Sequence, residues 1–225
     1  MNRHFAMLAA AAALVLANSG ARARATVLTF DGLGTNTPIP AGYGSHVSAA
    51  GPALLKGNNF TPNVAVAFVP NGANGFQTYN DAEWRAAQLD GTPPEGSFDV
   101  VFTPDAGYGV RVNSFQFDDY ANFAEGHTFD WSLLDADGNQ LAGQSEVTVD
   151  PDLTDDPTGA DNLLINTGLT AFHPGPVTLR ITPTAGDPFD RAIDNINFDQ
   201  AAVPEPASLG VLALATGLLA VRRRR

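Results

Sequence analysis

Acidic residues are the side chains of this sequence whose types and spacing could do chemistry, and Asp194 is the first of them. The apolar residues Ile196 and Phe198 alternate with polar ones, which predicts a strand, and Asp194 shares their parity. If those two residues face a core, Asp194 faces it at the edge of the strand. Burying a carboxylate alone costs several kcal/mol. Its candidate partners are a calcium ion, Arg180 or Arg191, and backbone N–H groups.

A second acidic pattern is Asp135-Ala-Asp137-Gly-Asn139, with Glu146 eleven positions after Asp135. These residues match positions one, three, five and twelve of a calcium-binding EF-hand loop. Gln140 stands at position six, where that loop needs glycine, and the flanking segments 128–134 and 144–149 alternate like strands. We therefore predict a hairpin turn on Asp137-Gly138 rather than a calcium loop.

Carboxylates could also catalyse glycoside hydrolysis, which needs two of them about 5 to 9.5 Å apart, one protonated. Between the two terminal segments the glutamates are Glu83, Glu95, Glu125 and Glu146, and nothing in their spacing singles out an acid–base pair. The sequence therefore favours a protein without catalytic activity.

Aromatic side chains in predicted connections are candidates for stacking on sugar rings. Tyr43, Tyr79, Trp84 and Tyr108 are the residues that we consider for such glycan contacts. Aromatic residues in such loops also cap the ends of a hydrophobic core, which is the structural alternative for each of them.

The elements that must position these residues are predicted strands. Apolar and polar residues alternate over 64–68, 98–102, 128–133, 147–149 and 177–181, as in antiparallel strands with one buried face. In 109–118 the apolar parity changes from Val110 and Val112 to Phe115 and Phe117, which predicts a β-bulge near Asn113. Residues 81–89 are the one helical candidate. Short strands between turns rich in glycine and proline favour an antiparallel β-sandwich.

The N-terminal segment has the composition of a secretory signal peptide. Asn2-Arg-His4 is basic, residues 5–16 are rich in alanine and leucine, and Ala23 and Ala25 each end an A-x-A cleavage site. The apolar run is too short to span a bilayer. We predict a signal peptide over residues 1–25, which signal peptidase removes after Ala25.

The C-terminal segment, residues 203–225, has three parts: Val203-Pro204-Glu205-Pro206, an apolar stretch over 207–221, and four arginines. As a helix the stretch is about 23 Å long against roughly 30 Å of hydrocarbon, and the arginines favour the cytoplasmic side. In this order the parts resemble the PEP-CTERM sorting signal. The resemblance implies a Gram-negative host that makes extracellular polysaccharide, and an exosortase in the inner membrane that recognises and removes the tail.

The segment between the two signals, residues 26–202, is one domain by its length. The whole chain has 12 basic and 24 acidic residues, a formal charge of −12, and the signals remove 7 of the basic and 1 of the acidic residues, which leaves −18. The electrostatic field of a domain with this negative charge repels nucleic acid and anionic membrane surfaces. The chain has no cysteine, so disulfide bonds cannot stabilise it.

The two ends of this domain, Thr29-Phe30-Asp31 and residues 192–198, resemble strands of jelly-roll modules of the galactose-binding or carbohydrate-binding type. In those modules the aspartate of the final strand often ligates a structural calcium ion, together with oxygens of the first strand and its loop. The resemblance thus implies a calcium site on Asp194 and Asp31. Carbonyl groups of residues 32–36 would complete the six to eight oxygens that calcium takes.

Together these features predict an all-β protein: an antiparallel β-sandwich of the jelly-roll or galactose-binding-like type, flanked by an N-terminal signal helix and a short hydrophobic C-terminal helix. We expect an exported, non-catalytic cell-surface or extracellular-matrix protein, anchored transiently in the inner membrane and associated with extracellular polysaccharide. The alternative is a carbohydrate-binding module with a structural calcium ion, and the third interpretation is a sandwich-type glycosidase or polysaccharide lyase.

Overall fold

The computed structural model describes residues 25–30, 32–34, 36–48, 55–57, 60–70, 76–78, 87–89, 97–119, 127–149, 163–185 and 191–203. Within these ranges the chain forms the strands β1 (Ala25–Leu28), β2 (Leu55–Gly57), β3 (Val64–Pro70), β4 (Phe76–Thr78), β5 (Ala87–Leu89), β6 (Phe98–Pro104), β7 (Tyr108–Asp119), β8 (His127–Leu134), β9 (Gln140–Val149), β10 (Leu163–Asn166), β11 (Val177–Ala185) and β12 (Arg191–Ala202). These same ranges contain no helix of the length and apolar character that a membrane span requires. The predicted terminal helices lie outside them.

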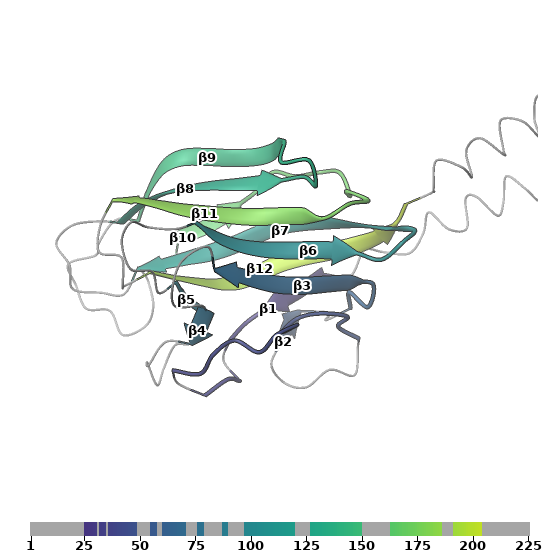
Figure 1. Cartoon of the computed structure of the whole chain (residues 1–225), viewed down its shortest axis with the longest axis horizontal. Coiled ribbons are helices and arrows are strands. Elements are labelled where there is room, and N and C mark those ends of the chain that lie inside the picture. Colours follow the sequence, from purple (N-terminus) through teal and green to yellow (C-terminus); the bar gives the residue numbers. More distant parts are fainter. Residues whose placement is uncertain are drawn as a thin grey trace, which may run out of the picture.

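The described strands form two antiparallel sheets that lie face to face (Figure 1). One sheet has seven strands in the order β10-β7-β12-β1-β2, with β5 paired to β12 and β4 paired to β5. The other has five strands in the order β3-β6-β11-β8-β9. The predicted all-β fold with two antiparallel sheets is therefore confirmed for this part of the chain.

Apolar side chains from the inner faces of both sheets form one core. Aromatic pairs join the sheets across it, among them Phe117 with Phe129, Phe102 with Phe198 and Phe115 with Trp131, whose ring centroids lie 3.9, 4.9 and 5.7 Å apart. Such pairs contribute roughly 0.5–1.5 kcal/mol each beyond the burial of their apolar area. The alternation read from the sequence thus places its apolar residues in one common interior.

The bulge predicted near Asn113 is present in β7. Val112 and Phe115 are both fully buried although they are three positions apart. The pairing with β12 shifts between Asn197, opposite Ser114, and Phe198, opposite Val112, so that Asn113 falls out of the register. The Asn113 amide donates to the Asn197 Oδ1 atom at 3.0 Å.

The helix predicted over 81–89 is wrong at its C-terminal end, where β5 forms instead. Gln88 pairs with Ala192 of β12 and with Gln77 of β4, both antiparallel. Two neighbouring strands thus supply partners to the backbone of this segment, and this tertiary pairing overrides a weak local helical preference. Residues 81–86 lie outside the described part of the chain.

One side of the sandwich is closed by residues 36–48. Ser45 accepts from the Val66 N–H at 2.7 Å and donates to the Val66 carbonyl at 3.0 Å, and the His46 N–H donates to the Val64 carbonyl at 2.7 Å. Both backbone groups of Val66 on the free side of β3 are therefore satisfied. A covered edge of this kind cannot pair with a further strand.

Candidate functional site

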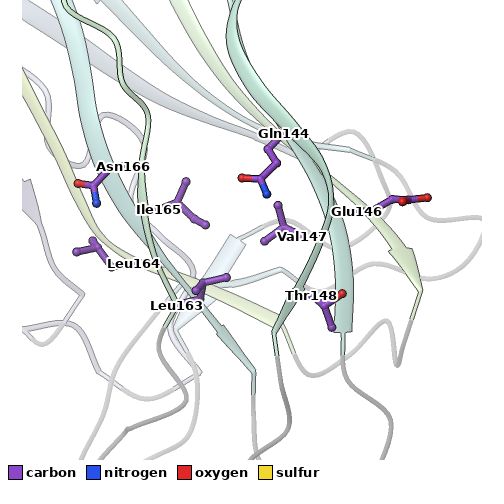
Figure 2. Close-up of a pocket in the computed structure, with 8 residues that line it drawn as sticks. All are labelled: Gln144, Glu146, Val147, Thr148, Leu163, Leu164, Ile165 and Asn166. Atoms are coloured by element: carbon purple, nitrogen blue, oxygen red, sulfur yellow. The ribbon is translucent and has the colours of Figure 1, made fainter.

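A groove of about 500 Å³ lies on the other side of the sandwich, between β9 and β10 (Figure 2). Each of these strands stands at the end of its own sheet, so each has one edge without a neighbouring strand among the described residues. The residues that line the groove are Gln144, Glu146, Val147 and Thr148 of β9 and Leu163, Leu164, Ile165 and Asn166 of β10.

Four side chains point into the space between the two strands: Gln144 and Val147 from β9, and Leu163 and Ile165 from β10 (Figure 2). Each of them is paired in register with an aromatic residue of the core, namely Trp131, Phe129, Phe117 and Phe115 respectively. Because cross-strand partners share a face of the sheet, the walls of the groove continue the core outward. The groove is the open side of the sandwich.

A bulge in β9 determines which side chains reach the groove. The register with β8 shifts between Phe129 and Trp131, so that Ser145 and Glu146 together oppose Asp130. Glu146 has φ +55°, and its N–H donates to the Asp130 Oδ1 atom at 2.8 Å. Strict alternation would place Gln144 and Val147 on opposite faces. The extra residue brings both to the groove and turns the Glu146 side chain outward (Figure 2).

The chemistry of the groove is that of contact and hydrogen bonding. Its lining residues, within the described ranges, include one carboxylate, two carboxamides, one hydroxyl, four aliphatic side chains, and neither a basic nor an aromatic residue. Leu164 is 54% exposed on its rim. Glycoside hydrolysis typically uses a pair of carboxylates, and the described lining residues supply one; their aliphatic and amide groups suit contact and hydrogen bonding.

The aromatic residues proposed for glycan contacts do not gather at this groove. Tyr43 is buried, stacks on Phe30 at 5.5 Å and donates its hydroxyl hydrogen to the Thr29 carbonyl. Its prediction as an exposed sugar contact is corrected, since its ring closes the core. Tyr108 is half-buried at the start of β7. Tyr79 and Trp84 lie outside the described residues.

Asp194 is buried as expected, with 3% of its surface exposed, but on the other face of the sheet from the one predicted. It pairs with Gln116, whereas Ile193 pairs with the core residue Phe117. Asn195, at φ +46°, starts a bulge that reverses the parity before Ile196. The prediction that Asp194 shares the face of Ile196 is therefore wrong.

The calcium site predicted on Asp194 and Asp31 stays a prediction, since Asp31 lies outside the described residues. The Asn195 amide donates to the Asp194 Oδ2 atom at 3.0 Å. Within the described ranges, His, Asp and Glu side chains form no group of three or more that could hold a metal ion.

The hairpin predicted on Asp137-Gly138 is confirmed. The Asp135 carboxylate accepts from the N–H groups of Asp137 and Asn139 at 2.9 and 2.8 Å and from the Asn139 amide at 3.0 Å. The side-chain hydrogen bond from Asn139, followed by its backbone hydrogen bond, lowers the pKa of Asp135 below its ordinary value. Gly138 has φ +80°, which glycine adopts without strain. The carboxylate thus holds a turn.

The two predicted processing sites lie at the ends of the described fold. Ala25, the last residue of the predicted signal peptide, is the first of β1 and pairs with Asp199. Val203 follows β12, and its N–H donates to the Gly107 carbonyl at 2.9 Å. Ala23, Pro204, Glu205 and Pro206 lie outside the described residues.

The groove itself was not predicted. Its two walls come from strands that belong to different sheets, and the sequence contains no signal that sets these strands side by side. The polar residue Gln144 is the local feature of the sequence that relates to the groove, and its position there depends on the bulge in β9.

No protein-family model matches this chain, and no curated protein matches it. Among solved structures it is similar to CBM27-1 of Caldicellulosiruptor saccharolyticus in complex with mannohexaose, at 13% identity and a TM-score of 0.37 over 58% of this chain and 88% of the other. A family 35 carbohydrate-binding module from Clostridium thermocellum has 13% identity and a TM-score of 0.33 over 61% and 92%. The Stig cyclase Fisc from Fischerella sp. TAU has 12% identity and a TM-score of 0.36 over 80% and 100%. At these values the likenesses do not bear on what this chain binds.

Proposed function

We propose that this chain is an exported, non-catalytic protein of the cell surface or extracellular matrix. Its C-terminal segment would anchor it transiently in the inner membrane of a Gram-negative bacterium until an exosortase-like enzyme removes that segment. The order of Pro204-Glu205-Pro206, apolar stretch and four arginines supports this route. The position of the motif supports it too, because β12 ends at Ala202 and the motif starts at Val203.

The observation that carries the non-catalytic part is the open groove between β9 and β10. It offers aliphatic contact, amide groups and one carboxylate, which suits a binding surface. The protein would meet its surroundings there, among the extracellular polysaccharide that accompanies the proposed sorting system.

The alternative is a carbohydrate-binding module. The carboxamides of Gln144 and Asn166 favour it because such groups hydrogen-bond sugar hydroxyls. The lack of an aromatic ring among the described lining residues counts against it. Affinity electrophoresis of the full chain in neutral and in acidic polysaccharide gels separates the two: retardation that disappears in Gln144→Ala would favour the carbohydrate-binding module.

The export route is tested in a Gram-negative host that carries an exosortase system, with an epitope tag inserted after Gly138 in the exposed β8–β9 turn. We expect a shortened product in the envelope or medium. Replacing Glu205 by alanine, or the four arginines by serine, should leave an unprocessed inner-membrane form, whereas Asp137→Ala in the turn should not. A soluble cytosolic product with intact arginines would refute the route. Release of reducing sugar from extracellular polysaccharide by the purified chain would instead indicate the glycosidase.

The structural calcium ion belongs to this proposal as well. If Asp194 and Asp31 hold calcium, the melting temperature should rise with calcium by the amount that ligand binding to the folded state dictates. The rise should disappear in Asp194→Asn and persist in Asp137→Asn, which changes an exposed carboxylate of the β8–β9 turn. An unchanged melting curve after chelation would count against the site.

A further inference from the structure

The two end strands of the five-stranded sheet, β3 and β9, differ in whether their free edges are covered. The free edge of β3 is covered at Val64 and Val66 by His46 and Ser45, which hydrogen-bond to the backbone of those residues. The free edge of β9 has no such cover among the described residues, and its sequence, Gln140 to Val149, contains neither proline nor lysine, two residues that commonly protect an edge. The bulge at Ser145 and Glu146 interrupts its hydrogen-bond ladder only locally. An uncovered edge beside a groove is the geometry that accepts an added strand.

We propose that the groove receives an extended polypeptide segment of another protein, with alternating apolar and basic side chains, which pairs with the free edge of β9. This inference rests on the proposed function as a non-catalytic binding protein and names the class of its partner. The added strand would extend the five-stranded sheet and close the open side of the sandwich.

The dimensions of the groove suit such a segment. The lining part of β9 runs from Gln144 to Thr148, which at about 3.3 Å per residue is at most roughly 17 Å of strand, since the bulge at Glu146 shortens it. A segment of five to seven residues covers that length. Backbone hydrogen bonds to β9 would supply affinity without regard to sequence, and side chains would supply the selection.

Alternate side chains of the added strand would meet two different surfaces. Those on the inner face would enter the groove between Val147 of β9 and Leu163 and Ile165 of β10, all aliphatic (Figure 2). Those on the outer face would stand beside the Glu146 carboxylate, which points away from the groove. This arrangement selects apolar residues at one parity and basic residues at the other.

Charge favours a basic partner over a second copy of this chain. The whole chain has a formal charge of −12, and Glu146 is the one charged residue among the described residues that line the groove. Two copies would repel each other, whereas a cationic strand is attracted. A glycan is disfavoured because the described lining offers no aromatic ring for stacking.

The test uses the full chain, purified in a mild detergent, and a fluorescent nonapeptide that alternates lysine and valine. Binding is measured by fluorescence anisotropy. The comparison probes are the same peptide with glutamate in place of lysine, the lysine peptide N-methylated at the residues of one parity, and mannohexaose as an unlabelled competitor. N-methylation removes strand hydrogen bonds while keeping every side chain.

We expect the lysine peptide to bind, the glutamate peptide to bind more weakly, and N-methylation to reduce affinity by about tenfold or more, as expected for loss of two or more hydrogen bonds. Glu146→Gln should lower the affinity for the lysine peptide about two- to fivefold, which is the range expected for an exposed ion pair. Ala67→Lys, which raises the net charge by the same one unit on the exposed face of β3, should not change the affinity. Gln144→Arg should obstruct the groove and weaken binding.

Other results would overturn the inference. Equal affinity of the N-methylated peptide would exclude strand pairing, and displacement of the peptide by mannohexaose would assign the groove to a glycan. A dimer that forms through β9 without peptide would assign it to a second copy. If the lysine peptide does not bind but the chain is sorted normally in cells, only the peptide-binding inference is refuted. If the lysine peptide binds but the chain is never exported, only the export route is refuted.

Discussion

Two buried aspartates, one on each sheet, are paired with arginines whose exposure differs, and this difference predicts unequal costs of removing the arginines. On the seven-stranded sheet, Arg111 Nε and Nη2 bind Asp199 at 3.1 and 2.7 Å. On the five-stranded sheet, Arg180 binds Asp99 at 2.8 and 2.7 Å, and this hydrogen bonding raises the pKa of Arg180. The side chain of Arg111 is 26% exposed and that of Arg180 is 42% exposed.

The perturbation is Arg111→Met, which keeps an apolar side chain against the Phe172 ring, 4.6 Å from the Arg111 guanidinium carbon. It leaves the Asp199 carboxylate, only 5% exposed, without its ion pair. Removing one partner of a buried pair costs about 3–5 kcal/mol. Because Arg111 is partly exposed and water can reach the vacated space, we expect about 2–3 kcal/mol. The same change at Arg180, which is more exposed, should cost about 1 kcal/mol.

The assay is urea unfolding of the full chain, followed by circular dichroism. With a slope of about 2 kcal/mol per molar urea, Arg111→Met should lower the midpoint by roughly 1–1.5 M and Arg180→Met by about 0.5 M. Replacing both partners, Arg111→Met with Asp199→Leu, should recover most of the loss, since no buried charge remains. Equal shifts for the two arginines would refute the reasoning that the exposure of the arginine sets the cost of removing it. No recovery in the double variant would refute the reasoning that the cost comes from the buried carboxylate left unpaired.

Two further predictions concern turns. Gly44→Ala should destabilise the fold by about 3 kcal/mol, because a Cβ at φ +78° would overlap a methyl carbon of the buried Leu28. Gly107→Ala, at φ +81° with open space around it, should cost only about 1 kcal/mol. Equal melting temperatures of the two variants would contradict the clash. Asp135→Ala should lower the melting temperature at neutral pH, because hydrogen bonds from Asn139 lower the pKa of Asp135 in the folded state below its ordinary value of 3.8. The stability that the Asp135 carboxylate contributes is therefore present above pH 3.8 and is lost as the pH falls through the lowered folded-state pKa. A gap between native chain and variant that stays constant down to strongly acidic pH would contradict this sign.

The longer strands and the bulge in β7 could be predicted because both follow from the local alternation of apolar and polar residues, whereas the short strands β2, β4, β5 and β10 were not predicted. Val112 and Phe115 differ in parity, and only an extra residue lets both reach the core. The turn on Asp137-Gly138 is equally local, because the Asp135 side chain and the glycine conformation lie within five residues.

Predictions that needed knowledge of neighbouring strands were wrong or missing. The face of Asp194 depends on a second bulge, at Asn195, which forms where β12 pairs with β7. Tyr43 belongs to a segment that folds back onto Phe30, so its ring joins the core instead of the surface. Backbone pairing with β12 and β4 converts residues 87–89 from a predicted helix end into a strand.

The sequence by itself determined the longer strand segments, the acidic character and the absence of disulfide bonds, because composition and period-two alternation are properties of the chain read in order. It also predicts the two terminal signals. Only the tertiary structure decided that β9 and β10 stand side by side with open edges while Ser45 closes the edge of β3. The physical reason is that backbone N–H and C=O groups line both edges of every strand, whatever the side chains are. The sequence of one strand therefore does not determine which of its edges pairs with another strand.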